Sequence, residues 1–257
     1  NHWRAKDGGT RSPLCPRSPN DPLFSAQWAL KNTGQNQGTA GIDINYLPAR
    51  EVTQGSSDII VAVLDHGTQL DHPDLNVSSK SYDTETGRSP SQIWGNHGTA
   101  CSGIISAKTN NNLGVAGIAP NCPVMSISNQ LMGTSDAPQK RADGFNWAWR
   151  NGASVISNSW RSSTFSELLE DAIQSAMTNG RNGLGCVVTF SAGNYDSNTV
   201  GYPARSLPDI IVVGALSLSG KRKSSTTIDN EGWWGSDYGT QLDIMAPGVL
   251  IYTTDRT

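Results

Sequence analysis

Three segments of the sequence each carry one chemically useful side chain at a point where a regular element begins or ends. Asp65 ends an uninterrupted apolar run, 59–64, and Gly67 follows it closely. His97 stands at the start of a stretch typical of a helix, and Asn194 comes after Ser-Ala-Gly behind a later apolar run. An imidazole oriented by a carboxylate is the general-base half of a nucleophilic triad. The asparagine amide is a neutral donor suited to a developing oxyanion.

The elements that would position these side chains alternate along the chain. The run 59–64 suits a strand buried on both faces, as in a parallel sheet covered by helices. We therefore predict an α/β fold with a mostly parallel central sheet and helices on both faces, in three layers. The predicted strands cover 59–64, 77–82, 123–128, 155–159, 186–190, 210–213 and 242–245, and the predicted helices cover 45–52, 96–107, 139–151 and 164–180.

Two local details of this scheme concern Asp65 and the last helix. Ligands gather at the carboxyl ends of strands in such sheets, which makes Asp65 a candidate for chemistry, with a simple turn-capping role as the alternative. The residues Thr164–Glu167 form a capping box that would open the last helix. Leu168 and Leu169 would then lie on the apolar face of that helix.

Length and composition limit the domain organisation and the partners. Residues 1–20 are rich in Pro, Arg, Gly and Ser and indicate an irregular arm, followed by one domain over 21–257. The net charge of −3, with 16% charged residues, implies no nucleic-acid partner and no membrane electrostatics. No apolar run reaches membrane-spanning length, so we expect no membrane insertion. No signal peptide opens the sequence, so a secreted protein would be present in its mature form.

Six short motifs in a fixed order give roughly residues 21–257 a resemblance to a known family. They resemble the consecutive motifs of the subtilisin-like serine proteases, the subtilase family, in which Asp precedes His and Ser comes last. The opening at Asp21 and the pair Ser159-Trp160 are similar to kexin-like and proteinase-K-like relatives, without deciding a subfamily. The six motifs are Asp65-His-Gly67, His97-Gly-Thr99, Gly117-Ile-Ala-Pro120, Ser191-Ala-Gly-Asn194, Val200-Gly-Tyr-Pro203 and Met245-Ala-Pro-Gly248.

The resemblance implies a serine endopeptidase that hydrolyses peptide bonds with an Asp-His-Ser triad. Asp65 would hold the imidazole in one tautomer, His97 would move the proton, and Asn194 would donate to the oxyanion. A peptide or protein substrate would pair with the strand leading into Trp160, with pockets for its side chains. The implied substrate-binding residues are Ser157, Ser159, Trp160, Ala192, Gly193 and Gly201.

Two charged residues near the implied pocket depart from the family pattern or add to it. Arg161 stands where relatives often have a glycine, so the shape of the pocket stays open. Asp196 follows Asn194 on the same loop and could favour a basic substrate residue. Its alternative is a solvated loop carboxylate, as most surface acids are.

The nucleophile does not occur where the resemblance places it. The family serine belongs to a Gly-Thr-Ser motif beyond the Met-Ala-Pro-Gly segment, whereas these residues stop at Thr257. The Gly-Thr-Ser at 133–135 precedes Asn194 and indicates a surface turn. Either a second chain, cleaved near Asp255-Arg256, carries the serine, or the sequence stops short of it, or the protein is an inactive pseudoprotease that acts as a binding protein. We favour the first two, and expect the 257 residues alone to fold poorly, because a missing core helix would expose apolar faces.

The resemblance further implies a structural Ca²⁺ site and a location outside the cell. The family's side-chain ligands match Asp21, Asp74 and Asn111, and its carbonyl ligands match Leu113 and Val115; an Asn-rich turn without metal is the alternative. Ca²⁺ takes about six to eight oxygen ligands, which such a set suits. The protein would be secreted or extracellular, or else periplasmic or on the cell surface. A propeptide or inhibitor would be a further partner.

The cysteines, and two alternative functions, a zinc site and a dinucleotide-binding domain, remain to be considered. Cys15, Cys101, Cys122 and Cys186 allow three pairings if all form disulfides, and the sequence does not choose among them. Relatives often have a buried free thiol at the position of Cys101, and we expect one here. The histidines lack the compact spacing of a zinc site. No G-x-G-x-x-G follows the first strand, which argues against a dinucleotide-binding domain.

Overall fold

A parallel sheet of seven strands forms the centre of the molecule. The computed structural model describes residues 17–257, so Cys15 and most of the predicted arm over 1–20 lie outside the described residues. The strands are β1 Ile60–Asp65, β2 Tyr82–Asp83, β3 Val124–Ser128, β4 Ala153–Asn158, β5 Val187–Ser191, β6 Ile211–Leu216 and β7 Ile244–Pro247. Their order is β2-β3-β1-β4-β5-β6-β7, and every neighbouring pair runs parallel.

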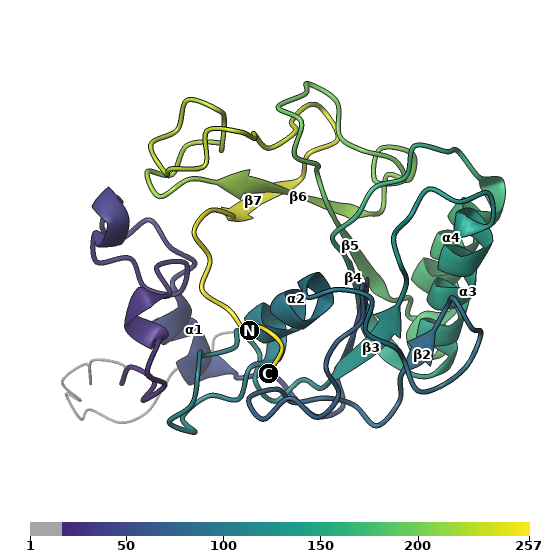
Figure 1. Ribbon diagram of the computed structural model, residues 1–257, viewed down its shortest axis with the longest axis horizontal. Helices are drawn as coiled ribbons and strands as arrows, with labels where there is room; N and C mark the ends of the chain where they lie inside the picture. Colours follow the sequence, from purple (N-terminus) through teal and green to yellow (C-terminus); the bar gives the residue numbers. More distant parts are fainter. Residues whose placement is uncertain (1–16) are drawn as a thin grey trace, which may run out of the picture.

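Helices cover both faces of this sheet, which confirms the predicted three-layer α/β fold. The α-helices are α1 Tyr46–Val52, α2 His97–Ser106, α3 Ala137–Arg150 and α4 Glu167–Gly183, and two 3₁₀ turns span Phe24–Ala26 and Gln35–Gln37. Figure 1 shows α2 on one side of the sheet and the adjacent pair α3 and α4 on the other. No helix among residues 17–257 is long and apolar enough to cross a membrane.

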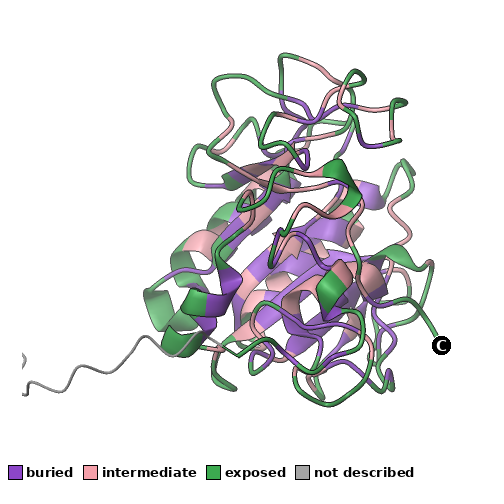
Figure 2. Cartoon of the chain, turned by 90° about the vertical axis from the view of Figure 1, so that its left-hand side faces the viewer, coloured by how far each residue is buried: buried purple, intermediate pink, exposed green. Residues whose placement is uncertain are grey.

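The buried core lies where the central strands meet these helices. In β1 every residue after Ile60 is buried, and all five residues of β3 are buried. Figure 2 shows this buried centre within a largely exposed surface of loops. A strand covered on both faces needs apolar side chains on both, which is why the continuous run at 59–64 predicted β1 correctly.

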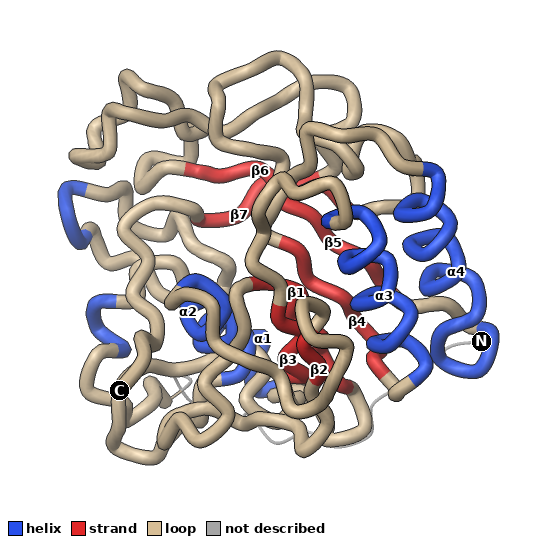
Figure 3. Tube along the Cα trace, turned by 45° about the vertical axis from the view of Figure 1, so that its right-hand side comes forward, coloured by secondary structure: helices blue, strands red, loops and turns tan. Residues whose placement is uncertain are grey.

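The sheet edges and the loops are less regular than the sequence indicates. The predicted strand at 77–82 is reduced to the two residues of β2, while Val77 makes only an isolated bridge to Val124. Figure 3 shows that the chain around β6 and β7 consists mostly of loops. This loop-rich region contributes part of the site described below.

The capping box predicted for α4 is wrong by two residues. Ser166, not Thr164, is the N-cap, and its hydroxyl accepts a hydrogen bond from the Leu169 N–H at 3.3 Å. Leu168 is consequently turned outward and is 46% exposed, whereas Leu169 is fully buried. Ser166 has the extended backbone that an N-cap requires, with φ −156° and ψ 114°.

Candidate active site

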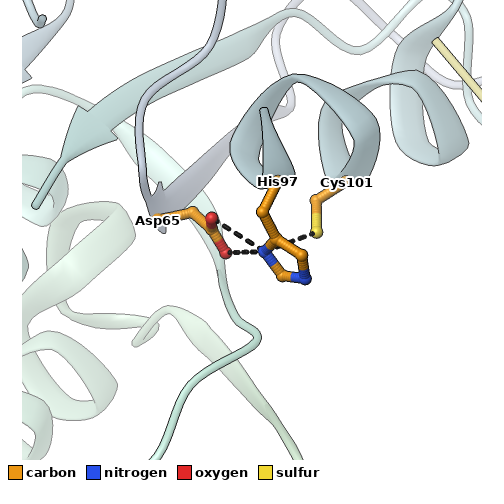
Figure 4. Close-up of side chains that lie close together, drawn as sticks. All are labelled: Asp65, His97 and Cys101. Atoms are coloured by element: carbon orange, nitrogen blue, oxygen red, sulfur yellow. Dashed lines mark hydrogen bonds and ion pairs between the residues drawn. The ribbon is translucent and has the colours of Figure 1, made fainter. Parts of the chain in front are cut away.

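Asp65 and His97 form a hydrogen-bonded pair at the carboxyl end of β1. The two Asp65 oxygens lie 2.8 and 2.9 Å from His97 Nδ1, and the buried carboxylate also accepts the His66 N–H at 2.7 Å. An ionised carboxylate can only accept, so Nδ1 carries the proton. In the neutral imidazole Nε2 is then the ring nitrogen without a proton, and Figure 4 shows it pointing away from Asp65.

The same carboxylate makes the imidazole more basic. The hydrogen bond that His97 donates to Asp65 is the largest cause that raises the pKa of His97 from 6.5 to about 10, followed by the contact with Cys101, while burial opposes both. A raised pKa means that the imidazolium is stabilised by its surroundings. Such a pair is suited to hold a proton that it has just taken from a nucleophile.

Close packing at the start of α2 brings His97 to Asp65. A Cβ atom on Gly98 would lie 2.4 Å from the Gly67 carbonyl oxygen, so only glycine allows the helix to approach this loop. Inside the contact, the Thr68 and Ser102 hydroxyls share a hydrogen bond of 2.7 Å. The separation of 32 residues between the acid and the base is closed by this helix–loop contact.

Cys101 is free, as expected, but it is not buried. It lies one turn after His97 on α2, and its Sγ is 3.8 Å from His97 Nδ1 and 3.7 Å from the Ser159 hydroxyl. Residues four apart share a helix face, so the thiol follows the imidazole into the site instead of entering the core. Cys122 and Cys186 are also free, so no disulfide joins the cysteines of the described chain.

Among residues 17–257, one group that includes a histidine brings three potential metal ligands together. Ligand atoms of Asp65, His97 and Cys101 lie within 4.8 Å of one another. His72 is engaged elsewhere, since its Nε2 donates to the Asp255 carbonyl oxygen at 2.9 Å and its Nδ1 accepts the Asp74 N–H. The three residues are thus better accounted for as an acid–base pair with a neighbouring thiol than as a zinc site.

A cleft of about 490 Å³ connects His97 to Asn194. Asn194 follows the carboxyl end of β5, its side chain is exposed, and its amide makes no hydrogen bond within the described chain. Four of the predicted substrate-binding residues line this cleft together with Cys101: Ser157, Ser159, Ala192 and Gly193. The cleft therefore combines a base, a free amide donor and backbone segments from two strand ends.

Two predicted substrate-binding residues lie behind the cleft wall. Trp160 is 7% exposed and packs edge-on against Phe190 at 4.9 Å between ring centres. Gly201 is buried, and its N–H donates to the Ala192 carbonyl oxygen at 2.9 Å. The sequence motifs located the region, but burial removes these two residues from direct contact with the cleft.

The predicted pairing of substrate with the strand at Ser157 needs a correction. Ser157 lies inside β4, with Val63 of β1 and Thr189 of β5 as its register partners. Its backbone therefore belongs to the sheet on both sides. Only the segment that begins beyond β4, at Ser159, is free to pair with an extended peptide.

The predicted Ca²⁺ ligands come together from three segments: Asp21, Asp74 and the loop over 110–115. The Asp21 oxygens accept the N–H groups of Asn110 and Asn111 at 3.0 and 3.2 Å. Asp74 accepts the Asn111 amide at 2.7 Å and the Val115 N–H at 3.2 Å. Leu113 donates its N–H to the Asn111 side-chain oxygen at 2.9 Å, which shapes the same turn.

The electrostatics of this loop fit a cation. Asp21 and Asp74 are 4% and 2% exposed, and neither forms an ion pair with a cationic side chain of residues 17–257. Burial is the main cause that raises the pKa of Asp74, and the charge of Asp21 adds to it. Buried carboxylates normally have a counter-charge, and hard oxygen ligands are those that Ca²⁺ prefers.

The charged residues beside the cleft differ from the sequence-based interpretation. Asp196 is neither free nor simply solvated, because it forms an ion pair with Arg222. The guanidinium of Arg161 lies 4.0 Å from the centre of the Tyr195 ring, and its Nη1 is 3.9 Å from Asp237. Asp237 was missed in the sequence, since it stands in no motif and is brought here only by the loop after β6.

The chain is similar to a known peptidase family and to curated members of it. Residues 56–257 match the model of the subtilase family of peptidases. The chain is 34% identical to a thermophilic serine proteinase from Bacillus sp. (strain AK1), with 95% of the chain and 57% of the relative covered. It is 30% identical to a calcium-dependent protease from Trichormus variabilis, with 91% and 37% covered.

Solved structures show the same fold. A protease from Pseudoalteromonas arctica PAMC 21717 superposes with a TM-score of 0.72 at 28% identity, over 90% of this chain and 73% of that one. The chain thus spans between about a third and three quarters of the length of the proteins it resembles. On the strength of the family match and of these similarities, the chain belongs to the subtilase family.

Proposed function

We propose that the chain forms the acid–base and oxyanion parts of a serine endopeptidase site. The observation that carries this proposal is the Asp65–His97 pair, because His97 lines the same cleft as Asn194, whose amide has no hydrogen-bond partner among residues 17–257. A general base must lie within reach of a proton, and an oxyanion donor must be free of internal partners. The second condition is met by Asn194 among the described residues, and the first requires the serine that this proposal supplies.

In the proposed reaction, His97 Nε2 takes the proton of a serine hydroxyl as its oxygen attacks the substrate carbonyl carbon. The negative charge that develops on the carbonyl oxygen is stabilised by the Asn194 amide. The imidazolium, stabilised by Asp65, then gives its proton to the leaving amine, and the peptide C–N bond breaks. A water molecule repeats the sequence on the acyl-enzyme and releases the second product.

The serine in this proposal lies outside the 257 residues. The chain covers 57% of the Bacillus relative and 37% of the Trichormus relative, so both relatives contain further residues. We propose that the serine is supplied by such a segment, either on the same natural polypeptide or on a second chain that stays docked after cleavage. An inactive pseudoprotease is the outcome that the test below must exclude.

The cluster of Asp21, Asp74 and the loop over 110–115 is proposed to hold a structural Ca²⁺ ion. Asp21, Asp74 and Asn111 would supply side-chain oxygens, and Leu113 and Val115 would supply carbonyl oxygens. A bound Ca²⁺ supplies positive charge and fixes the loop. We also propose a secreted or extracellular location, in keeping with this use of calcium.

A fluorophosphonate probe tests the proposal on the complete native protein. We expect covalent labelling of a serine, on the same polypeptide or on a co-purifying smaller one, because the probe requires an activated hydroxyl. The His97→Ala variant should lose the labelling, since the base is then absent. Absence of labelling in a folded native preparation would support the pseudoprotease and refute the proposed function.

A further inference from the structure

A buried carboxylate lies directly behind the cleft wall. Asp237 is fully buried, and its Oδ1 accepts the N–H groups of Tyr195 and Ser197 at 2.8 and 2.9 Å. Its Oδ2 is buried and has no hydrogen-bond partner in the described chain. An unpaired buried carboxylate oxygen is costly, so this atom needs a reason beyond support of the loop.

The unpaired oxygen lies against a residue that lines the cleft. A Cβ atom on Gly193 would be 2.1 Å from Asp237 Oδ2, and the Asp237 N–H donates to the Gly193 carbonyl oxygen at 2.8 Å. Gly193 lines the cleft beside Ala192 and Asn194. Any other residue at position 193 would place its side chain where the carboxylate now lies.

One cation reaches Asp237, and it crosses the region that the family resemblance gives to a substrate side chain. Arg161 Nη1 lies 3.9 Å from Oδ2, too far for a hydrogen bond. The arginine passes Gly201, where an added Cβ would be 3.1 Å from Arg161 Cβ. The Gly201 N–H in turn donates a hydrogen bond to the Ala192 carbonyl oxygen. The Arg161 side chain is 44% exposed and lies over the Tyr195 ring.

The other charges around Asp237 are already paired. Arg222 binds Asp196, donates to the Ser236 carbonyl oxygen at 2.6 Å, and lies over the Tyr238 ring at 4.3 Å. Asp196, the acid next to Asn194 in sequence, is therefore neutralised. Asp237 is left with a distant and partly exposed counter-ion.

We infer that Asp237 is a specificity-determining residue that favours lysine or arginine immediately before the scissile bond, and that Arg161 is the resident cation displaced by that side chain. The inference rests on the proposed function, because it assigns a selectivity to the same cleft. A substrate ammonium or guanidinium would donate to Oδ2, the acceptor that now lacks a donor. Charge-assisted hydrogen bonds to a desolvated carboxylate are stronger than neutral ones.

Two peptides that differ only at this position test the inference. One has lysine and the other norleucine, which keeps the methylene chain and lacks the ammonium. With the complete protease we expect kcat/KM for the lysine peptide to exceed that for norleucine by about 30-fold or more, as for other buried charge pairs. The Asp237→Asn variant should bring the ratio close to one, since Asn keeps an Oδ1 acceptor for the Tyr195 and Ser197 N–H groups.

Two further variants separate selectivity from loop support. Asp196→Asn should leave the lysine-to-norleucine ratio unchanged, because that acid is paired with Arg222. Arg161→Ala should lower KM for the lysine peptide, since the resident cation no longer competes. A variant that only lost stability would change neither the lysine-to-norleucine ratio of kcat/KM nor the KM for the lysine peptide in this way.

The outcomes distinguish failure of this inference from failure of the proposed function. Cleavage of both peptides at similar rates by the wild-type protein, or an unchanged ratio in Asp237→Asn, would overturn the selectivity. An unchanged KM in Arg161→Ala would overturn the displacement. If neither peptide is cleaved, the proposed function fails. Calorimetric binding of both peptides to the His97→Ala variant then still decides whether lysine is preferred.

Discussion

Lys223 is a fully buried cation in the loop region that forms one wall of the cleft. Its ammonium donates to Asp229 at 3.0 Å, to the carbonyl oxygens of Ser224 and Glu231 at 2.9 and 2.8 Å, and to the Thr227 hydroxyl at 3.1 Å. Trp234, which lines the cleft, lies 5.2 Å from the ammonium. We predict that replacing Lys223 with Met destabilises the protein strongly.

The magnitude follows from what the substitution leaves behind. Removing one partner of a buried ion pair costs about 3–5 kcal/mol, because the other charge stays buried. Burial acts to raise the pKa of Asp229, but the hydrogen bonds from Thr227 and Lys223 outweigh it and lower that pKa. Without Lys223 only the Thr227 hydroxyl and the Glu231 N–H would still donate to the carboxylate. We therefore expect a loss of about 3 kcal/mol for Lys223→Met, at the lower end of that range.

Urea denaturation of the complete protein measures this loss. The Asp229→Asn variant and the double variant complete a double-mutant cycle with Lys223→Met. Asp229→Asn should cost less, since three neutral oxygens still accept from the ammonium. The double variant should be more stable than the sum of the single losses predicts, by about 2 kcal/mol, because both charges are gone. Strict additivity, or a loss below about 1 kcal/mol for Lys223→Met, would refute this account of the buried pair.

Three shorter predictions concern the site and the calcium loop. Replacing Asn194 with Ala should lower kcat by about 10²–10³, the range found for one oxyanion donor in a subtilisin, and an unchanged kcat in peptide hydrolysis would contradict the proposed donor. Chelating calcium should lower the Tm of the complete protein, because the negative charges of Asp21 and Asp74 would then lie together without a cation. The Tm shift should be smaller in Asp74→Asn. An unchanged Tm in both proteins would argue against the site. Asp65, together with the contact to Cys101, raises the pKa of His97 from 6.5 to about 10, so the stability that these contacts contribute is fully present below about pH 6.5 and is lost as the pH rises to about 10. The difference in unfolding free energy between wild type and His97→Ala should narrow over that range, whereas a constant difference would exclude the linkage.

Much of the fold could be predicted because its information is local. Buried parallel strands need continuous apolar runs, so 59–64 and 123–128 identified the two most buried strands, β1 and β3. The start of α4 is ambiguous in the sequence, since Thr164 and Ser166 both offer a capping hydroxyl. Only the extended backbone at Ser166 decides between them.

The same distinction between local sequence information and tertiary structure applies to the candidate site. The sequence by itself determined the family and the pairing of Asp65 with His97, because strand ends and helix starts bring fixed motif positions together. Only the tertiary structure decided that Cys101 faces the cleft, that Asp196 is neutralised by Arg222, and that Arg161 reaches Asp237. Those contacts join side chains on separate loops, and their energies depend on distance and burial in space, which no spacing along the chain encodes.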